Sequence, residues 1–234
     1  MNVLSVIHGD NVRAGIFGEV VEERGHELDE WSLAWNRPLA RPLDEYGAVL
    51  VFGGAMHADQ DDRHPWLREE NFFLQRLLGL RIPVLGVCLG AQLLAKASHA
   101  PVHPASEPEI GWLPAELTEE ALNDPLFGRL PQQFQAFQWH YYTYGVPAGA
   151  EELAYSHVCT QAFRLGEAAW GIQFHAEVTH DQIQGWIDDD ERELPVSRDV
   201  LAEQTRAHIS EWNEIGRMLC GGFVEVAERA SALV

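Results

Sequence analysis

Residues 84–97 read VLGVCLGAQLLAKA, and this stretch decides the fold. An apolar run ends at Cys88, which lies between Gly86 and Gly90, and a leucine-rich helical pattern follows. A strand that turns sharply into a helix at a nucleophile is a nucleophile elbow. Such a turn strains the backbone of the nucleophile, and glycines two residues before and after it relieve the crowding. The stretch therefore predicts that Cys88 lies at the carboxyl edge of a sheet, where open α/β sheets bind ligands.

The helix after Cys88 has two consequences for the thiol. Its N-terminus points at the sulfur, and the helix dipole favours the thiolate over the thiol. The amide of Leu89 lies in the first turn and is free to donate to an oxyanion. A small buried core thiol is the alternative interpretation of a lone cysteine, but the flanking glycines and Gln92 favour a nucleophile.

Short apolar strands alternate with helical patterns over the first hundred residues. We expect strands at residues 2–7, 46–54 and 82–87, and helices at 13–25, 65–80 and 89–97. This alternation is typical of a parallel sheet with right-handed crossovers. Residues 101–171 contain several strand-like segments separated by turns, which predict a mixed or antiparallel edge on the same sheet.

The last part of the chain has a helical period. Apolar residues recur at three- and four-residue steps from about residue 198 onward, which predicts an amphipathic helix, broken near Gly221 and Gly222. The charged run DDDERELP before it predicts a solvated loop. Without an internal repeat or linker, residues 1–234 are expected to form a single domain, with a core at about 1–187 and a helical extension at about 198–230.

Composition excludes several classes of protein. The formal net charge is −20 and Lys96 is the only lysine, so nucleic-acid binding is not expected. No apolar run is long enough to span a membrane, and the N-terminal residues do not resemble a signal peptide. Three widely spaced cysteines (Cys88, Cys159 and Cys220) do not suggest a disulfide framework, so we expect a reducing, cytoplasmic location.

A thiolate nucleophile needs a base, and the base needs a group that orients it. The segment GIQFHAEV at residues 171–178 offers both. Residues two apart on a strand face the same side, so His175 and Glu177 project together. The carboxylate can accept one imidazole N–H and leave the other nitrogen for the thiol, which predicts a Cys88, His175 and Glu177 triad. A surface pair is the alternative interpretation of His-x-Glu when it is taken alone.

The segments GVCLGAQ and FHAE resemble the G-x-C-x-G-x-Q and x-x-H-P-E patterns of class I, triad-type glutamine amidotransferases. The resemblance covers residues from about 47 to 178, in order and with suitable spacing. The chain looks most like free-standing, GMP-synthase-like members, since EIGW, NDPLF, FQWH, QAFR and QFHAEVT are similar to segments found there. It implies an α/β, flavodoxin-like three-layer sandwich with a mostly parallel central sheet, helices on both faces and an antiparallel edge.

The resemblance also implies roles for residues around the nucleophile. The glycine loop after the second expected strand would supply one oxyanion donor from Gly54, and Leu89 would supply the other. Gln92 would help to hold the amino-acid end of the substrate. Two departures affect these expectations: Ala176 replaces the usual proline, which would stiffen the strand end beside Glu177, and FQWHYYTY puts bulky tyrosines where the family has small and acidic groups.

The implied reaction is hydrolysis of the γ-amide of glutamine, or of another γ-glutamyl compound, through a γ-glutamyl thioester. No metal or organic cofactor is expected. The ammonia would pass to a separate synthetase subunit, since no residues remain for a synthetase domain. The alternatives are a stand-alone γ-glutamyl peptidase or hydrolase, a catalytically silent binding protein, and the related Cys-hydrolase or chaperone group, which usually has histidine where this chain has Leu89.

Other polar clusters are weaker candidates. His99 and His103 flank Pro101, which argues against a helical pair of metal ligands. His8 ends the first expected strand, where packing is favoured over a role in the pocket. A cluster after the glycine loop is interpreted as loop rather than as a metal site; it contains His57, Asp59, Asp61, Asp62 and His64.

Overall fold

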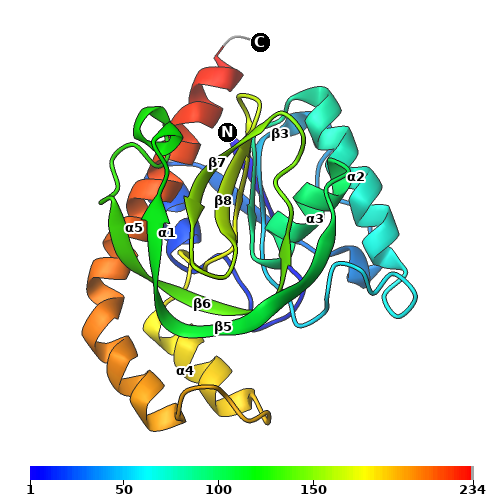
Figure 1. The fold of residues 1–234 in the computed structure, drawn as a ribbon. Helices are drawn as coiled ribbons and strands as arrows, with labels where there is room; N and C mark the ends of the chain where they lie inside the picture. The colour runs from blue at the N-terminus through cyan, green and yellow to red at the C-terminus, as the bar shows by residue number, and fades with distance from the viewer. Residues whose placement is uncertain (233–234) are drawn as a thin grey trace.

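A nine-stranded sheet runs through the computed structural model, which describes residues 1–232 (Figure 1). The strand order is β2-β1-β3-β4-β9-β8-β7-β5-β6. The first five strands in this order pair in parallel. They are β2 (Glu27–Trp31), β1 (Asn2–Val6), β3 (Tyr46–Val51), β4 (Val84–Val87) and β9 (Ala169–Ile172).

The other half of the sheet is antiparallel. It contains β8 (Thr160–Leu165), β7 (Ala150–Tyr155), β5 (Val102–Leu117) and β6 (Gln133–Tyr144). The long strands β5 and β6 pair along most of their length and curve across the lower part of the view (Figure 1). The antiparallel edge expected from residues 101–171 is therefore confirmed, and it is an extended part of the sheet.

Helices cover both faces of the sheet and complete a three-layer α/β sandwich (Figure 1). On one face lie α1 (Gly15–Glu23) and α5 (Arg198–Ser231), with α4 (His180–Asp189) packed beside α5. On the other face lie α2 (Trp66–Leu80) and α3 (Leu89–Ala97). Short 3-10 helices occur at η1 (Leu33–Trp35), η2 (Leu43–Glu45) and η3 (Glu120–Asn123). Each helix within residues 1–232 is too short or too polar to cross a lipid bilayer.

Two features differ from the expectations. The strand β2 was not predicted because its sequence, ELDEW, is polar; it lies at the sheet edge, half-buried, where Arg41 binds Glu27 and Asp29. The predicted break near Gly221 and Gly222 is wrong, since α5 is continuous.

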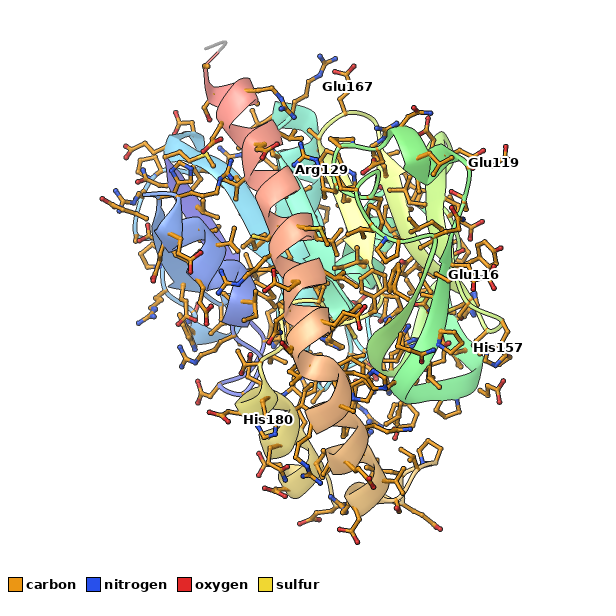
Figure 2. The ribbon with its side chains drawn as sticks, turned by 90° about the vertical axis from the view of Figure 1, so that its left-hand side faces the viewer. Glu116, Glu119, Arg129, His157, Glu167 and His180 are labelled. Atoms are coloured by element: carbon orange, nitrogen blue, oxygen red, sulfur yellow. The ribbon has the colours of Figure 1, made fainter. Side chains whose placement is uncertain are left out.

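The glycines of α5 fit a continuous helix. A Cβ atom on Gly222 would lie 2.8 Å from the carbonyl oxygen of Pro125, so glycine there permits close packing of the helix on a neighbouring loop. Figure 2 shows α5 spanning the height of the molecule, with Arg129 beside it. The guanidinium of Arg129 lies 3.6 Å from the carboxylate of Glu225 in α5.

The turn between β4 and α3 depends on close contacts between backbones. Cys88 has φ of 52° and ψ of −107°, a conformation that side-chain-bearing residues rarely adopt. A Cβ atom on Gly90 would lie 2.0 Å from the carbonyl oxygen of Val51, and one on Gly86 would lie 2.6 Å from the carbonyl of Gly90. The two glycines therefore let α3 begin directly against β3, and this contact fixes the direction of the Cys88 side chain.

We expect Gly90→Ala to destabilise the protein by at least the 1–3 kcal/mol that is typical of overpacking, because the clash is with backbone atoms. Gly79→Ala is the matched control: Gly79 also lies in a helix, and its Cβ would meet nothing within 4 Å. That substitution should stabilise α2 by about 0.5–1 kcal/mol. Urea unfolding of both variants tests this, and equal midpoints would contradict the role of the Gly90 contact.

Candidate active site

A cavity of about 520 Å³ opens at the carboxyl ends of the parallel strands. The sequence-predicted residues Cys88, His175, Gly54, Leu89 and Gln92 all line it. Aromatic and charged side chains complete the wall, and they include Trp139, Tyr141, Tyr142, Trp186, Asp189, Asp190 and Arg192. The structure therefore brings together in one cavity residues that lie far apart in the sequence.

Cys88 lines this cavity at the point where β4 ends and α3 begins. Its amide donates to the carbonyl of Ile172 at 2.8 Å, which ties the elbow to β9. The residue is 6% exposed, so the thiol is shielded but still reached from the cavity. The N-terminus of α3 begins at the next residue, and its dipole favours negative charge on the sulfur.

His175 and Glu177 form a buried pair, but they lie beyond β9, which ends at Ile172, so the expectation that they lie on a strand is wrong. The Nδ1 atom of His175 lies 2.8 Å from Oε1 of Glu177. Burial disfavours the charged ring, but attraction to the Glu177 carboxylate and the Cys88 sulfur outweighs it and raises the pKa of His175 to about 10. The site therefore favours the protonated ring of His175 beside the carboxylate of Glu177.

Gly53 brings His175 and Cys88 close together. A Cβ atom on Gly53 would lie 3.0 Å from Cε1 of His175 and 3.6 Å from Cβ of Cys88. A side chain here would push the imidazole away from the sulfur. The glycine loop after β3 therefore leaves the space that the pair occupies.

The segment that carries His175 and Glu177 is held by its backbone carbonyls. Trp212 Nε1 donates to the carbonyl of His175 at 2.7 Å, and the amide of Ile16 donates to that of Glu177 at 2.8 Å. Asn213 Nδ2 donates to the carbonyl of Val178 at 2.8 Å. A Cβ atom on Gly216 would lie 2.2 Å from the carbonyl oxygen of Ala176, so α5 packs directly on the segment. These contacts hold the segment after β9 that a proline at position 176 would otherwise stiffen.

Two residues that line the cavity with Cys88 have backbone amides of interest. Leu89 is the first residue of α3, so its amide has no intrahelical acceptor. The amide of Gly54 follows the end of β3 in the glycine loop. Within residues 1–232, neither amide donates to a protein acceptor, and both residues line the cavity.

Gln92 is buried in the cavity wall and is already held by the protein. Its Nε2 atom donates to the carbonyl of Tyr142 at 2.9 Å and lies 3.2 Å from Oε1 of Gln173. Tyr142 stacks on His57, with ring centroids 4.0 Å apart. Gln92 therefore connects α3 to the tyrosine wall of the cavity, a contact that the sequence did not predict.

The polar cluster after the glycine loop is divided among separate contacts. His57 stacks on Tyr142, and Asp61 binds Lys96 with oxygen and nitrogen 2.8 Å apart. His64 packs on Trp66. His99 lies in the turn after α3, and the exposed His103 lies in β5.

Two buried polar groups were missed by the sequence analysis. His8, for which packing was favoured over a role in the pocket, lines the cavity, and its buried ring pairs with Glu70 of α2 at 3.0 Å. The position of Glu70 on the apolar stripe of α2, between Leu67 and Leu74, is the signal that could have revealed it. The second group is centred on Glu109, whose Oε2 atom lies 3.1 Å from Nε2 of His140 and 3.4 Å from Sγ of Cys159. Its ligand atoms lie within 4.8 Å of one another and could hold a metal ion, but they already bind each other.

Comparison with known proteins shows the family to which the chain belongs. The family model described as glutamine amidotransferase class-I matches residues 17–194. The chain belongs to this family.

Relatives extend the match over most of the chain. A glutamine amidotransferase-like protein of Salmonella typhimurium is 30% identical over 218 residues, which cover 91% of each chain. A subunit of the glutamine-hydrolysing GMP synthase of Methanococcus aeolicus is 35% identical over 121 residues, which cover 50% of this chain and 63% of that protein. A glutamine amidotransferase structure from Thermotoga maritima superposes with a TM-score of 0.88 at 30% identity, over 96% of this chain and 98% of its own.

We predict that the ring of His175 titrates near pH 10, the value to which its pKa is raised. Glu177→Gln should lower the midpoint, because it removes the carboxylate that stabilises the imidazolium. NMR of protein with ¹⁵N-labelled histidine measures both, and His175→Gln identifies the signal. Glu228→Gln, which removes the partner of the distant His26, is the control and should leave the His175 midpoint unchanged. A midpoint that does not respond to Glu177→Gln would contradict the pairing.

Proposed function

We propose that this member of the class I glutamine amidotransferase family hydrolyses the γ-amide of glutamine, or of a related γ-glutamyl compound. The observation that carries the proposal is the convergence on one cavity of Cys88, the His175–Glu177 pair and the free amides of Gly54 and Leu89. A nucleophile, an oriented base and two oxyanion donors are the parts that acyl transfer to sulfur needs.

The reaction begins with the Cys88 thiolate and the protonated His175. The sulfur attacks the γ-carbonyl carbon, and the carbonyl electrons move onto oxygen to form a tetrahedral oxyanion. His175 then gives its proton to the leaving nitrogen, the C–N bond breaks, and a γ-glutamyl thioester and an amine or ammonia result. His175, now neutral, takes a proton from water, the resulting hydroxide attacks the thioester, and glutamate and the thiolate are released.

Other residues hold the reacting atoms in place. The Gly54 and Leu89 amides donate to the oxyanion, and loss of one such donor typically costs about 10²–10³ in rate. Glu177 keeps Nδ1 of His175 as a donor, so that Nε2 is left for the sulfur and the leaving nitrogen. Gln92 lies beside Cys88 and is proposed to help hold the amino-acid end of the substrate. Each step uses groups of this chain, and the proposed mechanism includes no metal or organic cofactor.

Two fates of the released nitrogen are proposed. In the first, a separate synthetase subunit uses the ammonia; the relative from Methanococcus aeolicus carries the name of a subunit of glutamine-hydrolysing GMP synthase. In the second, the protein alone hydrolyses γ-glutamyl amides or peptides. Tyr141 and Tyr142 in the wall, and the extension of the cavity to Arg192, favour a substrate with a tail. We also propose a reducing, cytoplasmic location, which would keep the Cys88 thiol free.

The test measures glutamate release from glutamine and from a panel of γ-glutamyl dipeptides and amines. We expect Cys88→Ala to abolish turnover, because no other group replaces the sulfur as nucleophile. His175→Ala should cost more than Glu177→Ala, since His175 transfers protons and Glu177 orients it. Cys220→Ala removes a buried thiol elsewhere in the core and is the control for loss of a cysteine.

Several outcomes separate the alternatives. Strong hydrolysis of γ-glutamyl amides or peptides without a partner favours the stand-alone hydrolase. Weak glutamine turnover that increases when a co-purifying synthetase is added favours an amidotransferase that supplies ammonia to a separate synthetase subunit. Turnover above a few per cent in Cys88→Ala contradicts the mechanism, and binding of γ-glutamyl compounds without hydrolysis by the natural protein indicates a silent binding protein.

A further inference from the structure

His8 lies two residues after the end of β1, and its ring is almost completely buried. Its Nδ1 atom lies 3.0 Å from the carbonyl oxygens of both Phe52 and Gly53. Carbonyl oxygens only accept hydrogen bonds, so Nδ1 carries a proton. Its Nε2 atom lies 3.0 Å from each carboxylate oxygen of Glu70, whose side chain is fully buried.

The surroundings of His8 favour the charged ring. Both nitrogens face acceptors, which only an imidazolium can satisfy at once. Burial opposes the charge, but the Glu70 carboxylate and the two carbonyls raise the pKa of His8 above its ordinary value. Trp66 stacks on the ring with centroids 5.6 Å apart and fixes its plane. The His8–Glu70 pair therefore holds the Phe52 and Gly53 carbonyls of the glycine loop through a ring whose charged form is favoured.

The bond from His8 to Gly53 constrains the neighbouring amide. The carbonyl of Gly53 and the N–H of Gly54 belong to one trans peptide group, so they point in opposite directions. A donor that holds the carbonyl on the His8 side therefore turns the N–H to the other side. A Cβ atom on Gly54 would lie 2.8 Å from Cβ of His8 and 2.9 Å from Cδ2 of Leu89, so the loop is closely packed between them.

We propose that His8, paired with Glu70, is a positioning residue that turns the Gly53–Gly54 peptide so that the Gly54 amide faces the oxyanion formed at Cys88. The inference rests on the proposed function, because the oxyanion exists only if Cys88 attacks a carbonyl. The charge of His8 also polarises the Gly53 carbonyl, which strengthens the N–H of the same peptide as a donor. His8 also lines the cavity, and in the inferred role it acts on the reaction through the Gly53–Gly54 peptide.

Two substitutions at one position separate this role from simple core packing. In His8→Asn the side-chain amide nitrogen takes the place of Nδ1 and still donates to the carbonyls. In His8→Gln it takes the place of Nε2, so the bond to Glu70 remains and the bond to the carbonyls is lost. We expect kcat to fall by about 10² in His8→Gln, close to the loss of an oxyanion donor, and by clearly less in His8→Asn.

Two further measurements distinguish positioning from a merely structural role of His8: the KM and the rate at which Cys88 is alkylated. An interaction made only in the transition state lowers kcat and leaves KM unchanged. Alkylation of Cys88 by iodoacetamide needs the thiolate but forms no oxyanion, so its rate should match the natural protein in both variants. His26→Asn breaks a second histidine–carboxylate pair, that with Glu228, and is the control; it should keep full kcat.

Glu70→Gln extends the test if His8→Gln does not fold, because it keeps the shape of the pair and removes its charge. Its kcat should lie between those of the natural protein and of His8→Gln. An unchanged kcat in the folded His8→Gln or Glu70→Gln variant overturns the inference, and so does a loss of alkylation that parallels the loss of kcat. Natural protein that alkylates at Cys88 but hydrolyses no γ-glutamyl substrate contradicts the proposed function, and the inference with it.

Discussion

The approach of Gly90 to the carbonyl of Val51 is the contact on which the site depends. A Cβ atom would lie only 2.0 Å from that oxygen, so α3 can start here only with glycine. This approach places Cys88 at φ of 52°, and the turn directs its side chain into the cavity rather than along the strand. The strain at Cys88 is stabilised by the surrounding core, since β3 and β4 are buried along almost their whole length.

The second half of the site is held from the opposite side of the sheet. The helix α5 binds the carbonyls of His175 and Val178 through Trp212 and Asn213, and α1 binds that of Glu177. The C-terminal helix therefore does more than cover apolar surface, because it holds the segment after β9 that carries the imidazole. His8 and Glu70 are proposed to fix the glycine loop in a comparable way, so each of these two segments of the site has a buried partner.

Local sequence patterns predicted the parts of the structure that depend on local constraints. The elbow glycines and the apolar strands follow from backbone geometry. His175 and Glu177 do pair as expected, but they lie in the segment after β9 and not on a strand. Strand β2 escaped prediction because an edge strand with one neighbour carries polar residues. The pairs His8–Glu70 and Glu109–His140 depend on contacts between residues far apart in the chain, which no local pattern reports. The continuity of α5 through its glycines likewise depends on a neighbouring loop.

The central claim is that the Cys88 sulfur becomes covalently bound to a γ-glutamyl group during turnover. Acid quenching of the reaction at early times, followed by intact-mass and peptide mass spectrometry, tests this most directly. We expect one γ-glutamyl adduct on the peptide that contains Cys88, and we expect it to disappear as the substrate is consumed. Product formation without any adduct on Cys88, or with the adduct on another residue, would contradict it.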